Sequence, residues 1–292
     1  MPAQPLTPQA FLTLLAVACL FGANHVAARV ALDHGMDVAS AVAVRSLATA
    51  LVVAGLALLA GVPWRFAPRH RRAMPAIGLL VGVQSLCLYS AVARIPVGLA
   101  LLAFNTYPLW TALAAWLLYR HRPERAVLIA MPVILVGLAL ALDAGGAASG
   151  LGARAQWALI GAGVGFAVAA AAVFGLALVL TQHEAADLDG RVRTALTMTI
   201  VGALALAGAL AQGGLRWPTA PAGWWGLVVL SLFYGTAITT MFTLLPRLGV
   251  VANSPVLNVE PVAALLMAWL VLGQAVSPTQ GAGALLVVGA VM

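Results

Sequence analysis

The chain has 292 residues, of which 63% are hydrophobic and only 8% are charged, and its mean hydropathy is +1.04. Soluble domains carry about 25% charged and about 45–50% apolar residues, so this composition predicts a protein embedded in a membrane along almost its whole length. The 15 basic residues are all arginine, which excludes a Schiff-base lysine and the phosphate-binding lysine of an ATP-driven pump. The net charge of +7 does not predict a nucleic-acid partner, because the arginines lie between apolar runs rather than along a basic stripe.

Successive apolar runs predict an all-α membrane protein with ten transmembrane helices. Short breaks with turn chemistry separate the runs. The last run has about fourteen residues and rises only about 21 Å, short of a hydrocarbon core of roughly 30 Å, so it either starts earlier or spans incompletely. The runs cover residues 10–31, 38–61, 73–93, 97–119, 126–143, 155–181, 193–212, 222–245, 250–272 and 279–292.

The distribution of arginines predicts the orientation of these helices. With the N-terminus in the cytoplasm, far more arginines lie in inside loops than in outside loops, and Arg45 alone lies within a helix. We therefore expect a multi-pass protein of the cell membrane, of the bacterial inner-membrane type, with both termini in the cytoplasm.

The sequence also repeats itself. The pattern N-x-x-P-x7-W occurs at residues 105–116 and again at 258–269, an offset of 153 residues. The repeat unit contains five predicted helices, and because five is odd, the second copy should enter the membrane in the opposite orientation. This predicts two inverted five-helix repeats, residues 1–144 and 145–292, with a substrate site near the midplane where they meet.

Several short segments along the chain form a pattern shared with a known family. They are Leu20-Phe21-Gly22-Ala23-Asn24, Arg45, Pro108, Asn258-Val259-Glu260-Pro261 and Leu272-Gly273-Gln274. On these segments, the chain resembles the drug/metabolite transporter superfamily, in particular its EamA-type members. This resemblance implies two five-helix halves around a central cavity, with the fifth and tenth helices packed away from it. It also implies transport of small molecules, because relatives export amino acids and other metabolites or carry sugar phosphates and nucleotide sugars. One departure is that Gln274 follows Gly273 where the family often has glutamate.

Two charged residues are the first candidates for a site. Glu260 is the one carboxylate inside the predicted membrane core, where an ionisable group costs at least about 2.5–3.5 kcal/mol and normally faces a cavity or a partner. It either binds a substrate ammonium group or a proton, or forms a fixed ion pair that holds its helix. Arg45 is the candidate counter-charge for Glu260 or for a substrate carboxylate, and the alternative is that it snorkels to the outer interface.

The remaining candidates are polar or aromatic residues in membrane runs and two prolines. Pro108 and Pro261 are the expected hinges, because each removes a backbone hydrogen bond. Asparagines three residues before them either satisfy the freed carbonyls or contact substrate. The other side chains are expected either to bind substrate or to pack structurally. These candidates are Asn24, His25, Tyr89, Asn105, Tyr107, Tyr234 and Asn258.

The function that fits these features best is a secondary transporter that exports amino acids or similar small metabolites by alternating access. A carrier of sugars, nucleotide sugars or other neutral metabolites is the alternative. An intramembrane enzyme or a channel fits less well, because no catalytic motif, like-charge ring or selectivity loop is present. We expect no enzyme activity, metal or cofactor. The expected partners are a small-molecule substrate, protons and the lipid bilayer, with no nucleic acid, in a monomer or a homodimer.

Overall fold

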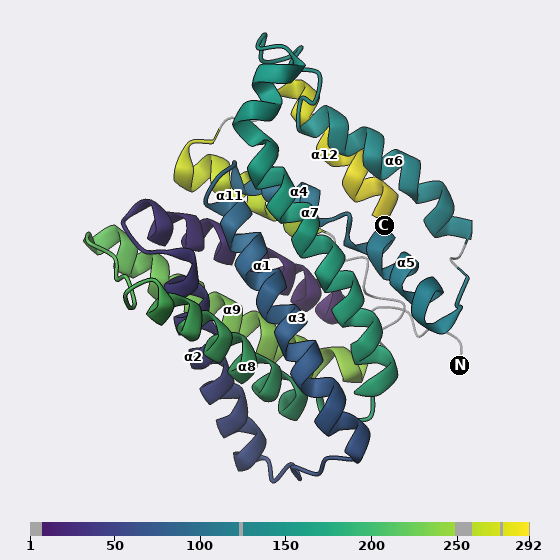
Figure 1. Cartoon of the computed structure of the whole chain (residues 1–292), viewed down its shortest axis with the longest axis vertical. Coiled ribbons are helices and arrows are strands. Elements are labelled where there is room, and N and C mark those ends of the chain that lie inside the picture. Colours follow the sequence, from purple (N-terminus) through teal and green to yellow (C-terminus); the bar gives the residue numbers. More distant parts are fainter. Residues whose placement is uncertain (1–7, 123–124, 249–258, 275–276, 292) are drawn as a thin grey trace.

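The fold is a bundle of helices, drawn in sequence colours in Figure 1. The computed structural model describes residues 8–122, 125–248, 259–274 and 277–291, and the regular elements within these ranges are helical. These helices are α1 (Pro8–Asp33), α2 (Val38–Leu59), α3 (Pro68–Val92), α4 (Val97–Phe104), α5 (Tyr107–Tyr119), α6 (Arg125–Ala141), α7 (Ala153–Glu184), α8 (Gly190–Ala211), α9 (Pro221–Leu248), α11 (Glu260–Leu272) and α12 (Pro278–Val291).

Seven helical stretches among the described residues are long and apolar enough to cross a membrane, with α4 and α5 counted as one stretch. Each lies within a few residues of a run expected from the sequence. The other helices are shorter: α6 has 17 residues, α11 has 13 and α12 has 14. The expected run 250–272 lies partly outside the described residues. Because α12 rises only about 21 Å, its length matches the short last helix expected from the sequence.

The expected run 97–119 is two helices rather than one. α4 ends at Phe104 and α5 begins at Tyr107, with Asn105 and Thr106 in a turn between them. Pro108 is the second residue of α5, a position where its missing N–H leaves no hydrogen bond unmade. In a continuous helix, its ring would clash with the carbonyl of Phe104. The kink expected at Pro108 is therefore a complete break.

The same local structure recurs in the second half of the chain. α5 and α11 have 13 residues each, and α11 also carries a proline, Pro261, as its second residue. Both helices end at a left-handed residue, Arg120 with φ 57° and Gly273 with φ 64°. These pairs of positions are separated by the same 153 residues as the sequence motif. The sequence repeat is thus also a repeat of helix length, helix start and helix end.

Two glycines at equivalent positions allow helices to cross with their backbones in contact. A Cβ on Gly22 of α1 would lie 2.8 Å from the backbone nitrogen of Ala264 in α11. A Cβ on Gly175 of α7 would lie 2.6 Å from the backbone nitrogen of Thr111 in α5. Gly22 and Gly175 are 153 residues apart, and so are Thr111 and Ala264. The two halves therefore share this close helix crossing.

The helices form two groups with a pair between them. α1 packs against α9 and α11, and we call these three helices the α1 bundle. α3, α4 and α5 each pack against α7, and we call these four helices the α3 bundle. α2 and α8 pack against each other and contact both groups, since α8 also packs on α3 and α2 on α9. α6 and α12 lie together at the edge of the molecule (Figure 1).

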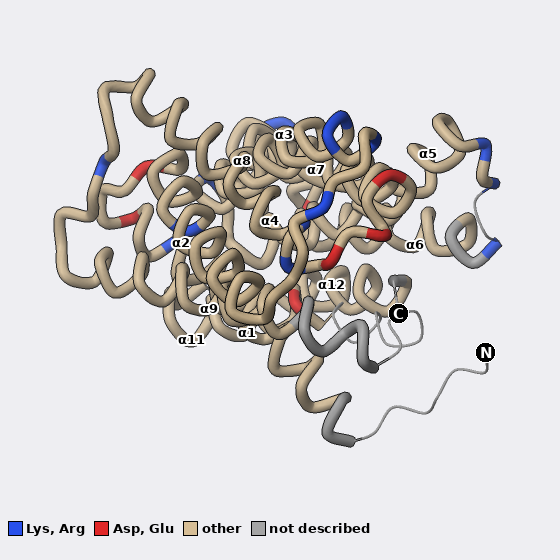
Figure 2. The backbone as a smooth tube through the Cα atoms, turned by 90° about the horizontal axis from the view of Figure 1, so that it is seen from below, with Lys and Arg blue, Asp and Glu red and all other residues tan. Residues whose placement is uncertain are grey.

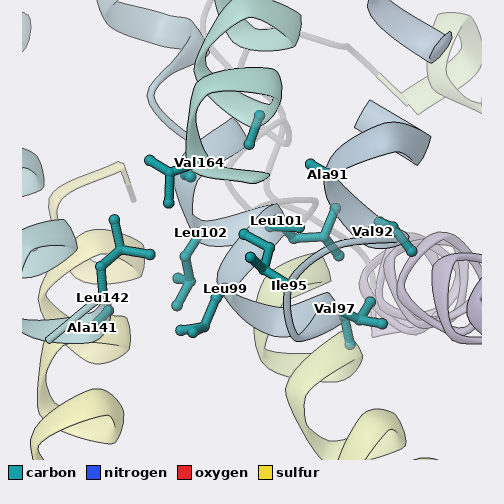
Figure 3. Packing of buried hydrophobic residues seen from close by; sticks show 14 of the residues in the cluster. Ala91, Val92, Ile95, Val97, Leu99, Leu101, Leu102, Ala141, Leu142 and Val164 are labelled. Carbon is teal, nitrogen blue, oxygen red and sulfur yellow. The ribbon is translucent and has the colours of Figure 1, made fainter. Parts of the chain in front are cut away.

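The largest apolar core surrounds α4. Leu99, Leu101 and Leu102 of this short helix meet Val164 of α7 and Leu142, which follows α6 (Figure 3). All five side chains are buried. This core connects the α3 bundle to the α6–α12 pair, and it also includes Val26 of α1 and Ala264 of α11.

At one end of the molecule, side chains connect the two bundles. Arg29 of α1 donates through Nη1 to the carbonyl oxygens of Val92 at 2.9 Å and Ile95 at 3.2 Å, at the end of α3. Gln274, just after α11, accepts through Oε1 from the N–H of Val97 at 3.1 Å, at the start of α4. We call this the Gln274 end. A glutamate at position 274 would offer the same kind of acceptor as Gln274.

At the opposite end, the loop between α7 and α8 is held to α3. Asp187 binds Arg69 at 2.6 Å and Nε2 of His70 at 2.9 Å, and we call this the Asp187 end. Nδ1 of His70 accepts from the N–H of Ala67, which leaves Nε2 to carry the proton and donate it to Asp187. Hydrogen bonds from Arg69 and His70 lower the pKa of the Asp187 carboxyl to about 2.

Charged residues occupy only short stretches of the backbone (Figure 2).

The close crossing of α5 and α7 generates a prediction. Gly175→Val should lower the melting temperature of the purified protein, because the new side chain would overlap the backbone of α5 at Thr111. Overpacking of this kind costs about 1–3 kcal/mol. Gly165→Val on the same helix is the matched control, since a Cβ there meets nothing within 4 Å. Equal melting temperatures for the two variants would show that the crossing does not require glycine.

A second prediction concerns Asp187. Its carboxyl pKa is lowered from 3.8 to about 2, so the ionised form stabilises the fold above pH 4 and this contribution is lost as the pH falls toward 2. Asp187→Asn should therefore melt at a lower temperature than the wild type at pH 7, and the difference should shrink between about pH 4 and pH 2. Thermal unfolding in detergent measures both values. A difference that stays constant over this range would contradict the assignment.

Candidate functional site

A cavity of about 440 Å³ lies between the α1 bundle and the α3 bundle, with α2 and α8 completing its wall. It extends from Tyr89, one turn before the end of α3, to Arg193 and Thr194 at the start of α8. The lining residues therefore extend from the last turns of α3 to the first turn of α8, at the Asp187 end. The predicted residues that line it are His25, Arg45, Tyr89, Asn105, Tyr107, Tyr234, Glu260 and Pro261.

Arg45 is fully enclosed by polar and aromatic side chains. Its guanidinium donates through Nη1 to the hydroxyl oxygen of Tyr89 at 3.1 Å. Nη2 lies 3.3 Å from the hydroxyl oxygens of both Ser46 and Ser85. Arg45 is only 2% exposed, so its side chain does not snorkel to the interface. Its Nε has no hydrogen-bond partner, which leaves one donor unused in the buried network.

An aromatic ring covers the guanidinium of Arg45. The Cζ atom lies 3.9 Å from the ring centroid of Tyr234 in α9 and 4.9 Å from that of Tyr89 in α3. A desolvated cation–π contact of this kind contributes about 2 kcal/mol or more. The positive charge is therefore held in place by three helices, α2, α3 and α9, without a carboxylate partner within 4.0 Å among the described residues.

Tyr89 connects Arg45 to Asn24. The hydroxyl group of Tyr89 donates to Oδ1 of Asn24 at 2.9 Å, and Nδ2 of Asn24 donates to the carbonyl oxygen of Phe21 at 2.8 Å. Asn24 is completely buried and does not line the cavity. It lies behind Tyr89 and orients the hydroxyl group, so it supports the site rather than facing a ligand.

Glu260 faces the cavity as the first residue of α11, where a helix N-terminus favours a negative charge. Its carboxylate oxygen lies 3.4 Å from Nε2 of His25 in α1. The Glu260 side chain is 27% exposed, whereas that of His25 is only 7% exposed. Nδ1 of His25 has no partner, and its imidazole ring packs edge-to-face against Tyr89 at 5.7 Å. Glu260 is thus the charged group of this pair that a ligand can reach.

The break between α4 and α5 places two further predicted residues at the cavity. Asn105 caps the end of α4, but its buried Nδ2 has no hydrogen-bond partner. Asn105 therefore does not donate to the carbonyl oxygen that Pro108 leaves without a partner, which was one of the two roles expected for it. Tyr107 begins α5 and lines the cavity. Pro108 follows it and is not part of the wall, whereas Pro261 is. Asn258 lies outside the described residues.

Several wall residues were not predicted from the sequence. Phe21 and Phe174 line the cavity at positions 153 residues apart, and the repeat offset is a signal that could have identified them. The polar residues Gln84, Ser85 and Thr197 also line it, but a lone hydroxyl or amide in an apolar helix carries no sequence signal of its own. Among the described residues, no group of three His, Cys, Asp or Glu side chains could hold a metal ion.

Comparison with known proteins identifies the family. The model of the EamA-like transporter family matches residues 9–142 and, in a second copy, residues 161–292. A solved structure titled only "Crystal structure of protein" is 20% identical, matches over 97% of this chain and 96% of its own, and has a TM-score of 0.65, which shows a shared fold. No curated protein matches the chain. With both halves matched by the family model, the chain is a multi-pass membrane protein of the EamA-like transporter family.

Proposed function

We propose that this protein is a secondary transporter that carries a zwitterionic small metabolite such as an amino acid, and that it works in the direction of export. The observation that carries the proposal is a cavity inside the apolar bundle whose wall carries the guanidinium of Arg45 and the carboxylate of Glu260. A second guanidinium, that of Arg193, lines the cavity at the start of α8. Arg45 contacts hydroxyl groups and aromatic rings, while Glu260 lies beside His25, so Arg45 and Glu260 do not form an ion pair with each other. A carboxylate and an ammonium group on one ligand complement them.

Alternating access is supported by the repeat. Under the offset of 153 residues, α1 corresponds to α7, α2 to α8, α3 to α9, α5 to α11 and α6 to α12. The packing of α1 on α9 then corresponds to that of α7 on α3, and α1 on α11 to α7 on α5. We infer that residues 1–144 and 145–292 are inverted repeats, with ten spans in all. Two such halves can exchange conformations and expose the cavity to each side in turn.

The orientation follows from the arginines. The Asp187 end carries Arg65, Arg69, Arg71, Arg72 and Arg191 in or near its loops, whereas the Gln274 end carries fewer. By the positive-inside rule, we infer that the Asp187 end is cytoplasmic, as both termini are, in a bacterial-type inner membrane. The cavity reaches toward this end, which corresponds to an inward-facing state that can load substrate from the cytoplasm.

In this mechanism, the contacts at the Gln274 end keep the cavity closed on the outside. Arg29 and Gln274 belong to the α1 bundle, and their partners are backbone groups at the end of α3 and the start of α4. Both contacts must break for the bundles to separate there. Substrate binding between Arg45 and Glu260 and a proton on Glu260 or His25 would bias this exchange, because a ligand shifts an equilibrium by its differential affinity for the two states.

Nucleotide sugars and sugar phosphates fit this wall less well. A phosphate group is best held by several cationic groups that reach it together. The wall carries two guanidiniums, but Arg45 lies beside Tyr89, whereas Arg193 lies at the start of α8, near the Asp187 end. Neutral metabolites remain the second candidate, since Thr194 and Thr197 offer hydroxyl groups there.

The role proposed for Glu260 predicts the effect of removing its charge. Glu260→Gln should abolish uptake of a zwitterionic substrate, or its pH dependence, because neither an ammonium group nor a titrating proton would find a carboxylate. Uptake by proteoliposomes across a range of pH values measures this. Glu184→Gln is the control, since that carboxylate binds Tyr119 at 3.1 Å outside the cavity. Unchanged flux and pH profile in Glu260→Gln would contradict the proposal.

The role proposed for Gln274 predicts a change in accessibility. Gln274→Ala should expose the cavity to the outside more often, because the Val97 N–H loses its acceptor. A hydrogen bond worth about 0.5–1.5 kcal/mol corresponds to a roughly two- to tenfold rise in labelling rate. The assay uses Leu178→Cys in a background with Cys19→Ser and Cys87→Ser, and a membrane-impermeant maleimide added to whole cells.

Gln274→Glu is the matched control for this experiment, because its carboxylate keeps an acceptor oxygen for the same N–H. It should label at the rate of the parent protein. Equal labelling rates for the alanine and glutamate variants would show that this hydrogen bond does not hold the outer side closed.

A further inference from the structure

At four pairs of equivalent positions, the two sides of the cavity carry different chemistry. Under the offset of 153 residues, each of four charged or polar wall residues corresponds to an uncharged, mainly apolar residue that also lines the wall. The two sides therefore share one backbone arrangement but differ in their side chains at these positions. We call the side with the four uncharged residues the apolar face. The pairs are His25 and Leu178, Arg45 and Met198, Ser85 and Ile238, and Glu260 and Tyr107.

Three aromatic rings gather on the apolar face. The ring centroid of Phe104 in α4 lies 5.7 Å from that of Tyr107 in α5 and 5.4 Å from that of Phe174 in α7. Tyr107 and Phe174 meet edge-to-face at 5.3 Å. The break after α4 and the close crossing at Gly175 bring these helices together. We call Phe104, Tyr107 and Phe174 the aromatic cluster.

The aromatic cluster lines the cavity, and the described residues leave part of each ring exposed there. All three side chains line the wall, and each is only partly buried although it lies in the interior of the bundle. Apolar surface in contact with water is unfavourable by roughly 25 cal/mol for each Å². A ligand with an apolar group of similar size would remove this surface from water.

We infer that the transported zwitterion carries a bulky apolar or aromatic side chain, which packs on the aromatic cluster while its charged head group lies at Arg45 and Glu260. This inference rests on the proposed function, and it adds the substrate class. The cavity volume of about 440 Å³ lies within the range of about 300–1,000 Å³ that small-molecule pockets occupy. A substrate with a small or a charged side chain does not cover the aromatic cluster and leaves the rings in water.

The test is counterflow into proteoliposomes with five labelled amino acids: phenylalanine, leucine, alanine, serine and glutamate. Phenylalanine and leucine should have KM values at least about tenfold lower than those of alanine and serine, because each buried methylene group discriminates substrates by roughly tenfold or more. Glutamate should have a KM at least about tenfold higher than that of phenylalanine, because its charged side chain does not pack on the aromatic cluster. Equal KM values for alanine and phenylalanine would overturn the inference while leaving amino-acid transport established. No transport of any of the five, by protein shown to be folded, would instead refute the proposed function.

Variants of Phe174 test whether the aromatic cluster determines the preference for substrates with bulky side chains. Phe174→Ala should reduce the preference for phenylalanine over alanine, measured as the ratio of their KM values, by about tenfold. Phe174→Leu keeps most of the side-chain volume and should reduce the preference less. If the alanine variant does not fold, the leucine variant still tests the role of Phe174. Trp116→Leu on α5 is the control, because that side chain is exposed on the outside of the bundle and should leave the preference unchanged. An unchanged preference in both Phe174 variants would contradict the role of the aromatic cluster.

Discussion

The buried guanidinium of Arg45 is the constraint on which the rest of the site depends. A charge at this depth is tolerated only where protein groups replace water, and here hydroxyl groups of α2 and α3 and an aromatic ring of α9 do so. These contacts fix three helices around one side chain. Through Tyr89, the same network positions Asn24 and packs against His25, which in turn binds Glu260. Both charged residues therefore belong to one connected network of side chains that lines the cavity.

The backbone explains how such a site fits in an apolar bundle. Prolines at the second position of α5 and α11 place Tyr107 and Glu260 at helix starts, and matched glycines bring the partner helices against those starts. The repeat thus supplies two similar half-sites. Divergence of the side chains then made one face charged and the other aromatic. A duplicated framework with different chemistry on its two sides suits a ligand whose two ends differ.

Much of the architecture follows from the sequence, because membrane spans need long apolar runs and the repeat is visible at Asn105 and Asn258. The candidates Arg45 and Glu260 also follow from it, since charges in apolar helices are rare. Their partners do not follow from it. Which hydroxyl groups surround Arg45, and that Asn24 lies behind Tyr89, depend on packing between helices far apart in the chain. The sequence predicted one helix over residues 97–119, because a proline inside an apolar run is equally compatible with a kinked helix and with two separate helices.

The most direct test is uptake of a labelled amino-acid mixture into liposomes that contain the purified protein, with and without an imposed proton gradient. This account predicts uptake above that of empty liposomes, and a change in its rate when the gradient is applied. Absence of uptake by protein that is folded and correctly inserted, together with uptake of a neutral sugar under the same conditions, would contradict the central claim that Arg45 and Glu260 bind a zwitterion.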